Sequence, residues 1–160
     1  MMGMSAVAIP NSRQRGPRMH IFLCHASDDN PAVRMWYKRL LNDDFRPWLD
    51  EECLLPGQDW DHEISKAVRS SGAVLVFLSR ASISKEGFVQ KEIKYALDVA
   101  DEKPEGTIFV VPVKLEECTV PSRLRRWQWV DLFLEGGYVR LSEALRSRQR
   151  SVWDMMDDSP

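Results

Sequence analysis

The chain has 160 residues, of which 22 are lysine or arginine and 24 are aspartate or glutamate, and its formal net charge is −2. This length allows one domain with a buried core and is too short for two independent domains. Because the sequence has no basic surplus, direct binding to nucleic acid or to an anionic membrane surface is not expected.

The N-terminus and the cysteines indicate the cellular compartment. Residues 1–18 are predicted to form a disordered leader, since their only apolar stretch is too short for the core of a signal peptide. No apolar run approaches the roughly 18 residues that a membrane span requires. The three cysteines are widely spaced and lack a C-x-x-C pair, so we expect reduced thiols in a cytoplasmic protein rather than disulfides or a zinc site.

The first half of the chain alternates between strand and helix patterns. The apolar run at 20–24 predicts a buried strand, and the apolar residues of 32–41 recur at helical spacing. A short strand is predicted at 46–49. A loop that contains Pro56 and Gly57, a strong turn signal, then leads into a second helix over 58–70.

The second half continues this alternation. Residues 73–79 are continuously apolar and rich in β-branched side chains, as expected of a central parallel strand that is covered on both faces. A helix at 85–100, a strand at 107–113, a short strand at 127–130 and a helix at 139–146 follow. The pattern predicts an α/β domain over 19–147 with a flavodoxin-like, doubly wound sheet of five parallel strands, and a flexible C-terminal tail over 148–160.

Three short segments share features with one known family and occur in the right order. IFLCHASDD at 21–29 is a strand that ends in an acidic polar loop, LDEECLLPGQDW at 49–60 is a loop that ends in Pro-Gly, and RRWQWVDL at 125–132 is rich in aromatic residues. They resemble the three boxes of the Toll/interleukin receptor (TIR) domain family. Residues 73–97 are similar to the strand, serine-rich loop and helix that hold the glutamate of NAD-cleaving members, among them bacterial defence effectors.

The resemblance assigns roles to particular residues. It implies that Glu92 is the catalytic glutamate and that Phe88, one helical turn earlier, borders the substrate, although the family often has tryptophan there. It also implies that NAD+ is a substrate rather than a cofactor. No metal site is expected, because His62 and Glu63 are not followed by a second histidine at the H-E-x-x-H spacing. The other implied substrate-binding residues follow the first and central strands, at the sheet edge where such folds bind ligands: His25, Ala26, Ser27, Asp28, Ser79, Ser82 and Ser84.

Each of these residues also has a structural interpretation. On a helical wheel Glu92 lies between Phe88 and Ala96, among apolar neighbours, where it could pair with a lysine or cap a loop amide instead of acting on a substrate. Ser84 could be the N-cap of the following helix, and Ser27 or Asp28 could be the N-cap of the first helix. The sequence leaves these alternatives open.

The implied reaction is cleavage of the nicotinamide–ribose bond of NAD+, which gives nicotinamide and ADP-ribose or a cyclic isomer. Nicotinamide leaves as a neutral molecule, so no general acid is required, and one carboxylate can hold the ribose and stabilise the oxocarbenium-like charge. The resemblance further implies an effector of immune or defence signalling. Its activity would be gated by self-association or by a sensor or activator protein.

A second function remains open from the sequence. The loop that the resemblance implies for self-association comprises Asp50, Leu54, Leu55, Pro56 and Gly57. A non-catalytic module would dock on other TIR domains through this loop and through the surface of residues 125–132. One fold can host both roles, so the presence of Glu92 among apolar neighbours is the feature that favours an enzyme.

Overall fold

The computed structural model describes residues 16–49, 54–84 and 90–157. Within this part of the chain, five strands form one parallel sheet in the order β2-β1-β3-β4-β5. The strands are β1 (His20–Cys24), β2 (Arg46–Trp48), β3 (Ala73–Leu78), β4 (Val110–Lys114) and β5 (Val130–Asp131). The predicted fold class, an α/β doubly wound sheet, is confirmed.

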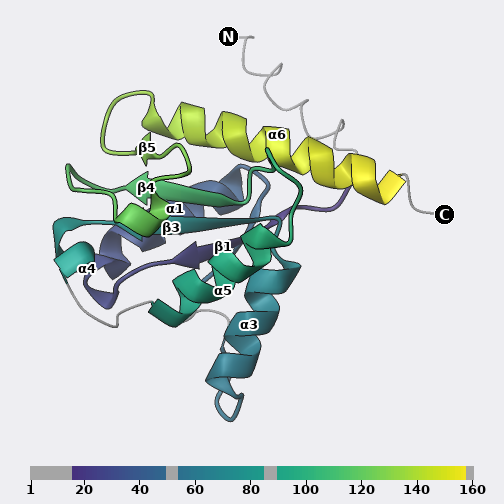
Figure 1. Cartoon of the computed structure of the whole chain (residues 1–160), viewed down its shortest axis with the longest axis horizontal. Coiled ribbons are helices and arrows are strands. Elements are labelled where there is room, and N and C mark those ends of the chain that lie inside the picture. Colours follow the sequence, from purple (N-terminus) through teal and green to yellow (C-terminus); the bar gives the residue numbers. More distant parts are fainter. Residues whose placement is uncertain (1–15, 50–53, 85–89, 158–160) are drawn as a thin grey trace, which may run out of the picture.

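Helices cover both faces of the sheet (Figure 1). The main helices are α1 (Asn30–Asn42), α3 (Trp60–Ser70), α5 (Gln90–Asp101) and α6 (Gly137–Asp157). Shorter turns of helix, η2 (Ser27–Asp29), α4 (Arg80–Ser84) and η3 (Ser122–Leu124), lie in the connections. None of the helices in the described part of the chain is long and apolar enough to cross a membrane.

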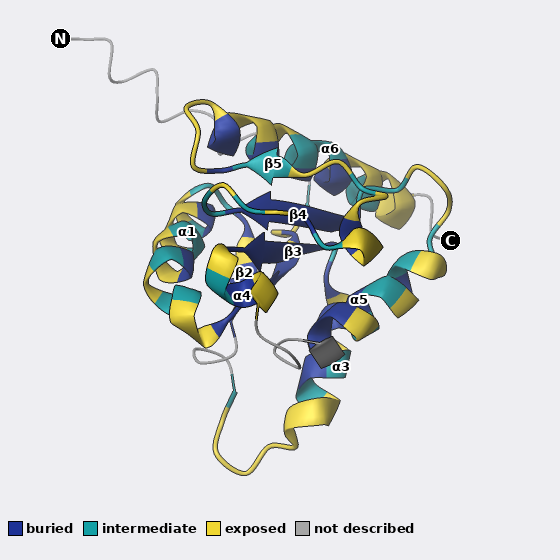
Figure 2. Ribbon diagram, turned by 60° about the vertical axis from the view of Figure 1, so that its left-hand side comes forward, coloured by how far each residue is buried: buried dark blue, intermediate teal, exposed yellow. Residues whose placement is uncertain are grey.

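The side chains of each strand alternate between two apolar cores. Ile21 and Leu23 of β1 pack with residues of α1 and α6, such as Leu40 and Leu145, on one face of the sheet. Phe22 and Cys24 face the other way, into the core built with α3 and α5. All six residues of β3 are buried, which explains its uninterrupted apolar sequence. Figure 2 shows β3 and β4 buried, β5 partly exposed and the outer faces of the helices exposed.

The last helix differs from the sequence prediction. A helix at 139–146 and a flexible tail over 148–160 were expected, but α6 continues to Asp157, so the tail prediction is wrong for residues 148–157. Two contacts hold this extension on the domain. Arg148 Nε donates to the carbonyl oxygen of Gly72 across 2.8 Å, and Trp153 Nε1 donates to that of Pro17 across 3.0 Å. The predicted leader falls mostly outside the described residues.

The proline in β4 shows which side of that strand is exposed. The carbonyl of Phe109 accepts from Val74 N, and Leu115 N donates to Leu78 O. Because alternate residues of a strand bond to the same neighbour, the backbone groups of the odd-numbered residues from 109 to 115 point toward β3. Pro112, which has no amide hydrogen, therefore faces the β5 side, where its missing donor breaks no bond to β3. Because β5 pairs only with Val113 and Lys114, the first half of this edge of β4 is left without a strand partner in the described chain.

Candidate functional site

The carboxyl ends of β1 and β3 bring several of the predicted site residues to one edge of the sheet. Cys24 at the end of β1 pairs with Val76 of β3. His25 and Ala26 follow β1 and are buried, and Ser79 follows β3 and is 4% exposed. The N-terminal end of α5, which carries Glu92, lies on the same side of the molecule (Figure 1).

Hydrogen bonds connect the two loops at this edge. The hydroxyl of Ser79 donates to Oδ2 of Asp29 across 2.8 Å. Next to this contact, His25 Nε2 and Asn30 Oδ1 are 2.5 Å apart. Burial raises the pKa of the Asp29 carboxyl, and the hydrogen bond from Ser79 opposes that rise. The loop after the first strand is thus fixed against the loop after the central strand.

Ser79 and Ser82 form a reciprocal cap at the start of α4. Ser82 N donates to Ser79 Oγ across 3.1 Å, and Ser79 N donates to Ser82 Oγ across 2.8 Å. This is the arrangement of a capping box, with serine in the place of the usual glutamate. Both side chains are buried, so their hydroxyls already serve the backbone and the Asp29 carboxylate.

The structure separates three predicted residues from this network. Ser27 and Asp28 are exposed in η2, and α1 has Asp29 at its N-cap without a side-chain capping bond. The interpretation of Ser27 or Asp28 as an N-cap of the first helix is therefore wrong. Ser84 is also exposed, and its hydroxyl donates back to Ala81 O across 3.0 Å at the end of α4. Phe88 lies outside the described residues.

Glu92 occupies the first described turn of α5 and is only 5% exposed. The neighbouring helix positions that face inward, Ile93 and Ala96, are buried in the core formed with α3. A carboxylate near the start of a helix is favoured by the helix dipole, but burial at this level is uncommon for glutamate. Glu92 is thus held on the side of the molecule where the parallel strands end, close to apolar side chains.

A third loop, after β4, adds charges that the sequence analysis did not identify. Glu116 Oε2 accepts from Arg80 N across 2.8 Å, and Arg80 Nε donates to Glu117 O across 3.1 Å. Lys114 Nζ lies 2.9 Å from Glu117 Oε1 and 3.6 Å from Asp131 Oδ1. The hydrogen bond to Glu117 raises the pKa of Lys114. The sequence signal for this cluster was the polar run that follows the strand at 110–114.

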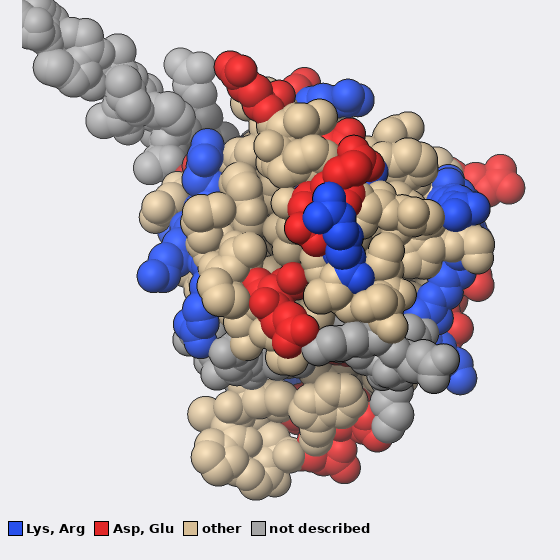
Figure 3. All heavy atoms as spheres, turned by 90° about the vertical axis from the view of Figure 1, so that its left-hand side faces the viewer, with Lys and Arg blue, Asp and Glu red and all other residues tan. Residues whose placement is uncertain are grey.

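Figure 3 looks onto this edge of the sheet and shows acidic side chains grouped near its centre, with basic side chains beside them. The acidic residues of the three loops include Asp28, Asp29, Glu116 and Glu117. Such a surface favours a ligand that presents positive charge to it. Among the described residues, no group of three potential ligands is arranged to hold a metal ion.

The predicted interaction loop projects from the domain before α3. Leu55 is 67% exposed, and Pro56 and Gly57 are exposed with it, whereas Leu54 is half-buried. Gly57 has φ +90°, and Gln58 N donates to Leu55 O across 3.1 Å. This is a tight turn with proline and glycine at its centre, as the sequence predicted. Asp50 lies outside the described residues.

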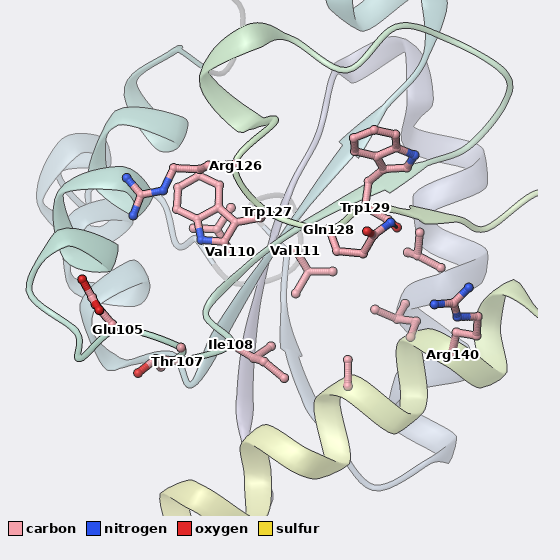
Figure 4. Close-up of a pocket in the computed structure, with 14 residues that line it drawn as sticks. Glu105, Thr107, Ile108, Val110, Val111, Arg126, Trp127, Gln128, Trp129 and Arg140 are labelled. Carbon is pink, nitrogen blue, oxygen red and sulfur yellow. Dashed lines mark hydrogen bonds between the residues drawn. The ribbon is translucent and has the colours of Figure 1, made fainter.

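A cavity of about 500 Å³ lies away from Glu92, beside the edge of β4 that has no strand partner in the described chain. Trp127 and Trp129 stand on either side of it, with Arg126 next to Trp127 and Arg140 of α6 at the opposite end (Figure 4). Val110 and Val111 line its floor. The aromatic segment at 125–132 thus forms one wall of a cavity, while Trp127, Val130 and Leu132 also pack against the apolar cores.

Comparison with known proteins identifies the fold and the family. The sequence model of the family described as TIR domain matches residues 21–145. A protein of Sinorhizobium fredii, "Uncharacterized protein y4cD", is 27% identical over 142 residues, which cover 86% of this chain and 22% of that protein. The chain therefore spans less than a quarter of this relative's length.

Two solved structures share the fold. The TIR domain of the Toll-related receptor TRR-2 from Hydra magnipapillata has a TM-score of 0.66 and 16% identity, covering 79% of this chain and 97% of that one. The TIR domains of the activated Roq1 resistosome, which recognises the pathogen effector XopQ, have a TM-score of 0.52 and 21% identity, covering 60% and 57%. Together with the family match, these findings show that the chain belongs to the TIR domain family.

Proposed function

We propose that the chain is an NAD+ glycohydrolase in which Glu92 is the catalytic residue. The observation that carries this proposal is the burial of Glu92, 5% exposed, at the start of a helix on the ligand-binding edge of the sheet. A buried carboxylate costs free energy that a structural role on a helix surface would not require. The helix that carries it begins on the same side of the molecule as the carboxyl ends of β1 and β3, where folds of this kind bind ligands.

The charge of this edge suits the reacting half of NAD+. The nicotinamide ring is a cation before cleavage, and positive charge moves to the ribose as the glycosidic bond breaks. Glu92 would stabilise that charge and hold the ribose hydroxyls, an electrostatic contribution that increases where water is excluded. The Asp29 carboxylate accepts the Ser79 hydroxyl and holds the two loops together. One acting carboxylate is sufficient, since neutral nicotinamide needs no proton to leave.

The test is release of nicotinamide by the purified protein at high concentration, with and without a crowding agent. Glu92→Ala and Glu92→Gln are expected to lower the rate by roughly a hundredfold or more. Glu143→Gln, an exposed glutamate on α6, is the matched control and should keep the wild-type rate. An unchanged rate in Glu92→Gln would contradict the assigned role, and a folded, self-associated wild type without turnover would favour the second function below.

The second candidate is a docking module that assembles with other TIR domains. The observation in its favour is the exposed apolar turn at Leu55 together with the cavity that the 125–132 segment lines. The same contact would serve an enzyme whose activity is gated by assembly. Leu55→Asp is expected to lower the self-association measured by sedimentation, whereas Met156→Asp, at another exposed apolar residue, should not. Equal self-association of both variants would exclude this turn as the contact.

A further inference from the structure

A buried arginine lies at the opposite edge of the sheet from Glu92. Arg148 of α6 is 6% exposed, and Nε of its guanidinium donates to the carbonyl oxygen of Gly72, just before β3, across 2.8 Å. Among the described residues no carboxylate lies within ion-pair distance of it. A buried cation is normally paired, because an uncompensated charge in the protein interior is costly.

A second cation stands close to this arginine. Lys103 precedes β4 and is half-buried, with Nζ 5.2 Å from the centre of the Phe109 ring. Burial lowers the pKa of Lys103, and the charge of Arg148 lowers it further. The adjacent Glu102 acts on the pKa of Lys103 in the opposite direction, but its carboxylate is 3.3 Å from Arg69 and is already paired. The two cations therefore repel each other, and among the described residues neither forms an ion pair with a carboxylate.

Both cations line one small cavity between α6 and the loop of residues 103–107. Its volume is about 270 Å³, below the roughly 300–1,000 Å³ of pockets that take drug-sized molecules. The other polar side chains of its wall are the exposed carboxylate of Glu105 and the hydroxyl groups of Thr107, Ser147 and Ser151. Thr107 and Ser151 already donate to backbone carbonyl oxygens, so the donors that remain for a ligand are chiefly the two cations. They match an anion rich in acceptor oxygens.

We propose that this cavity is a binding site for a phosphate group, held by Arg148 and Lys103. A phosphate monoester carries about −1.5 to −2 charges at pH 7, which balances two cations, whereas a carboxylate balances one. The planar guanidinium of arginine matches two oxygens of such an anion. The proposal is independent of NAD+ cleavage at Glu92, because the cavity lies at the amino ends of β3 and β4.

The size of the cavity limits what else can bind there. A whole dinucleotide does not fit in about 270 Å³, but residues 105–108 also line the larger cavity beside β4. An organic phosphate would therefore place its phosphate group beside Arg148, and the rest of the molecule would extend over residues 105–108 toward the larger cavity. Inorganic phosphate and the phosphate of a nucleotide such as AMP offer the same chemistry to Arg148, so both are used as probes.

The experiment measures binding of inorganic phosphate and of AMP to the full chain by calorimetry, with sodium chloride at equal ionic strength as the reference. We expect Arg148→Met and Lys103→Met each to weaken phosphate binding at least roughly tenfold. Arg150→Gln, an exposed arginine two positions along α6, is the control and should bind as wild type. Lys103→Met keeps the test valid if Arg148→Met does not fold.

Each outcome decides the proposal. Tighter binding of AMP than of phosphate would identify an organic phosphate as the ligand, and equal binding would identify free phosphate. Either result supports the site if both variants weaken it. Wild-type affinity in Lys103→Met, or heat of binding no larger than that of chloride, would overturn it.

Discussion

The hydroxyl of Ser79 donates a 2.8 Å hydrogen bond to Oδ2 of Asp29, which joins residues 50 positions apart at the ends of β3 and β1. The same Ser79 oxygen accepts from Ser82 N at the start of α4. One side chain thus ties the central strand, the following helix and the first loop together. This contact sets the spacing of the two loops that flank the candidate site.

Ser79→Ala should destabilise the protein by about 2–3 kcal/mol, because it removes both a helix cap and a hydrogen bond to a carboxylate. Ser84→Ala is the matched control, since Ser84 is exposed and its hydroxyl bonds only to Ala81 O. We expect that variant to cost less than about 0.5 kcal/mol. The free energy of unfolding in urea measures both, and equal values would show that the Ser79–Asp29 contact adds no stability.

Asp29 should make stability depend on pH. Burial raises its pKa in the folded protein above the ordinary value of 3.8, so between the unfolded and folded pKa values the folded state binds more protons. Stability should therefore fall as pH rises from about 4 through the folded pKa. Asp29→Asn removes this titration, and its stability relative to wild type should increase over the same range. A difference between the two proteins that is constant with pH would contradict the raised pKa.

The strands were predictable from sequence because burial on both faces leaves a local signal. Residues 73–78 read as a continuous apolar run, and β3 is buried at every position. The two-residue strand β5 was placed only approximately, because its pairing with Val113 and Lys114 of β4, rather than its own composition, decides its ends. Glu92 itself was singled out by the resemblance to the TIR family, and its role at the site stays a prediction.

Contacts between distant segments could not be predicted. The sequence did not predict the short helix α4 or its cap by Ser79 and Ser82, because this cap depends on where the central strand ends in space. The bonds of Arg148 to Gly72 and of Trp153 to Pro17 join residues that are far apart in the chain. Without them, the polar residues after 147 read as a tail.

Lys114 at the end of β4 is expected to stabilise the protein through its ion pair with Asp131 of β5. Its side chain is 8% exposed, and Asp131 Oδ1 is buried with no hydrogen-bond partner in the described chain, so its compensation comes from the Lys114 ammonium 3.6 Å away. Lys114→Met should cost about 2 kcal/mol by leaving this carboxylate unpaired. Glu117→Gln is the control: Glu117 is 72% exposed, and such a pair contributes at most about 1 kcal/mol.

The result for Lys114 is read from thermal unfolding of the two variants. A lower melting temperature for Lys114→Met than for Glu117→Gln supports the role of Asp131. If the double variant Lys114→Met with Asp131→Asn were no more stable than Lys114→Met alone, the cost would come from lost packing and not from the unpaired carboxylate.

Removal of residues 148–160 should destabilise the domain, although the sequence reads as a tail. The deletion takes away the buried side chains of Arg148 and Gln149 and the packing of Val152 against the core. It also removes the hydrogen bond of Trp153 to Pro17. From burial of this size we expect a loss of at least about 2 kcal/mol in the free energy of unfolding.

Deletion of residues 158–160 alone is the control for this truncation. Those three residues follow the end of α6 at Asp157, so their removal leaves all of the named contacts in place and should leave the melting temperature within about one degree of wild type. Trp153→Ala in the full chain separates the two causes. If this variant lowers stability while the short deletion does not, α6 is an integral part of the domain beyond residue 147. Equal free energies of unfolding for the 148–160 deletion and the wild type would instead show that α6 adds no stability from Arg148 onward.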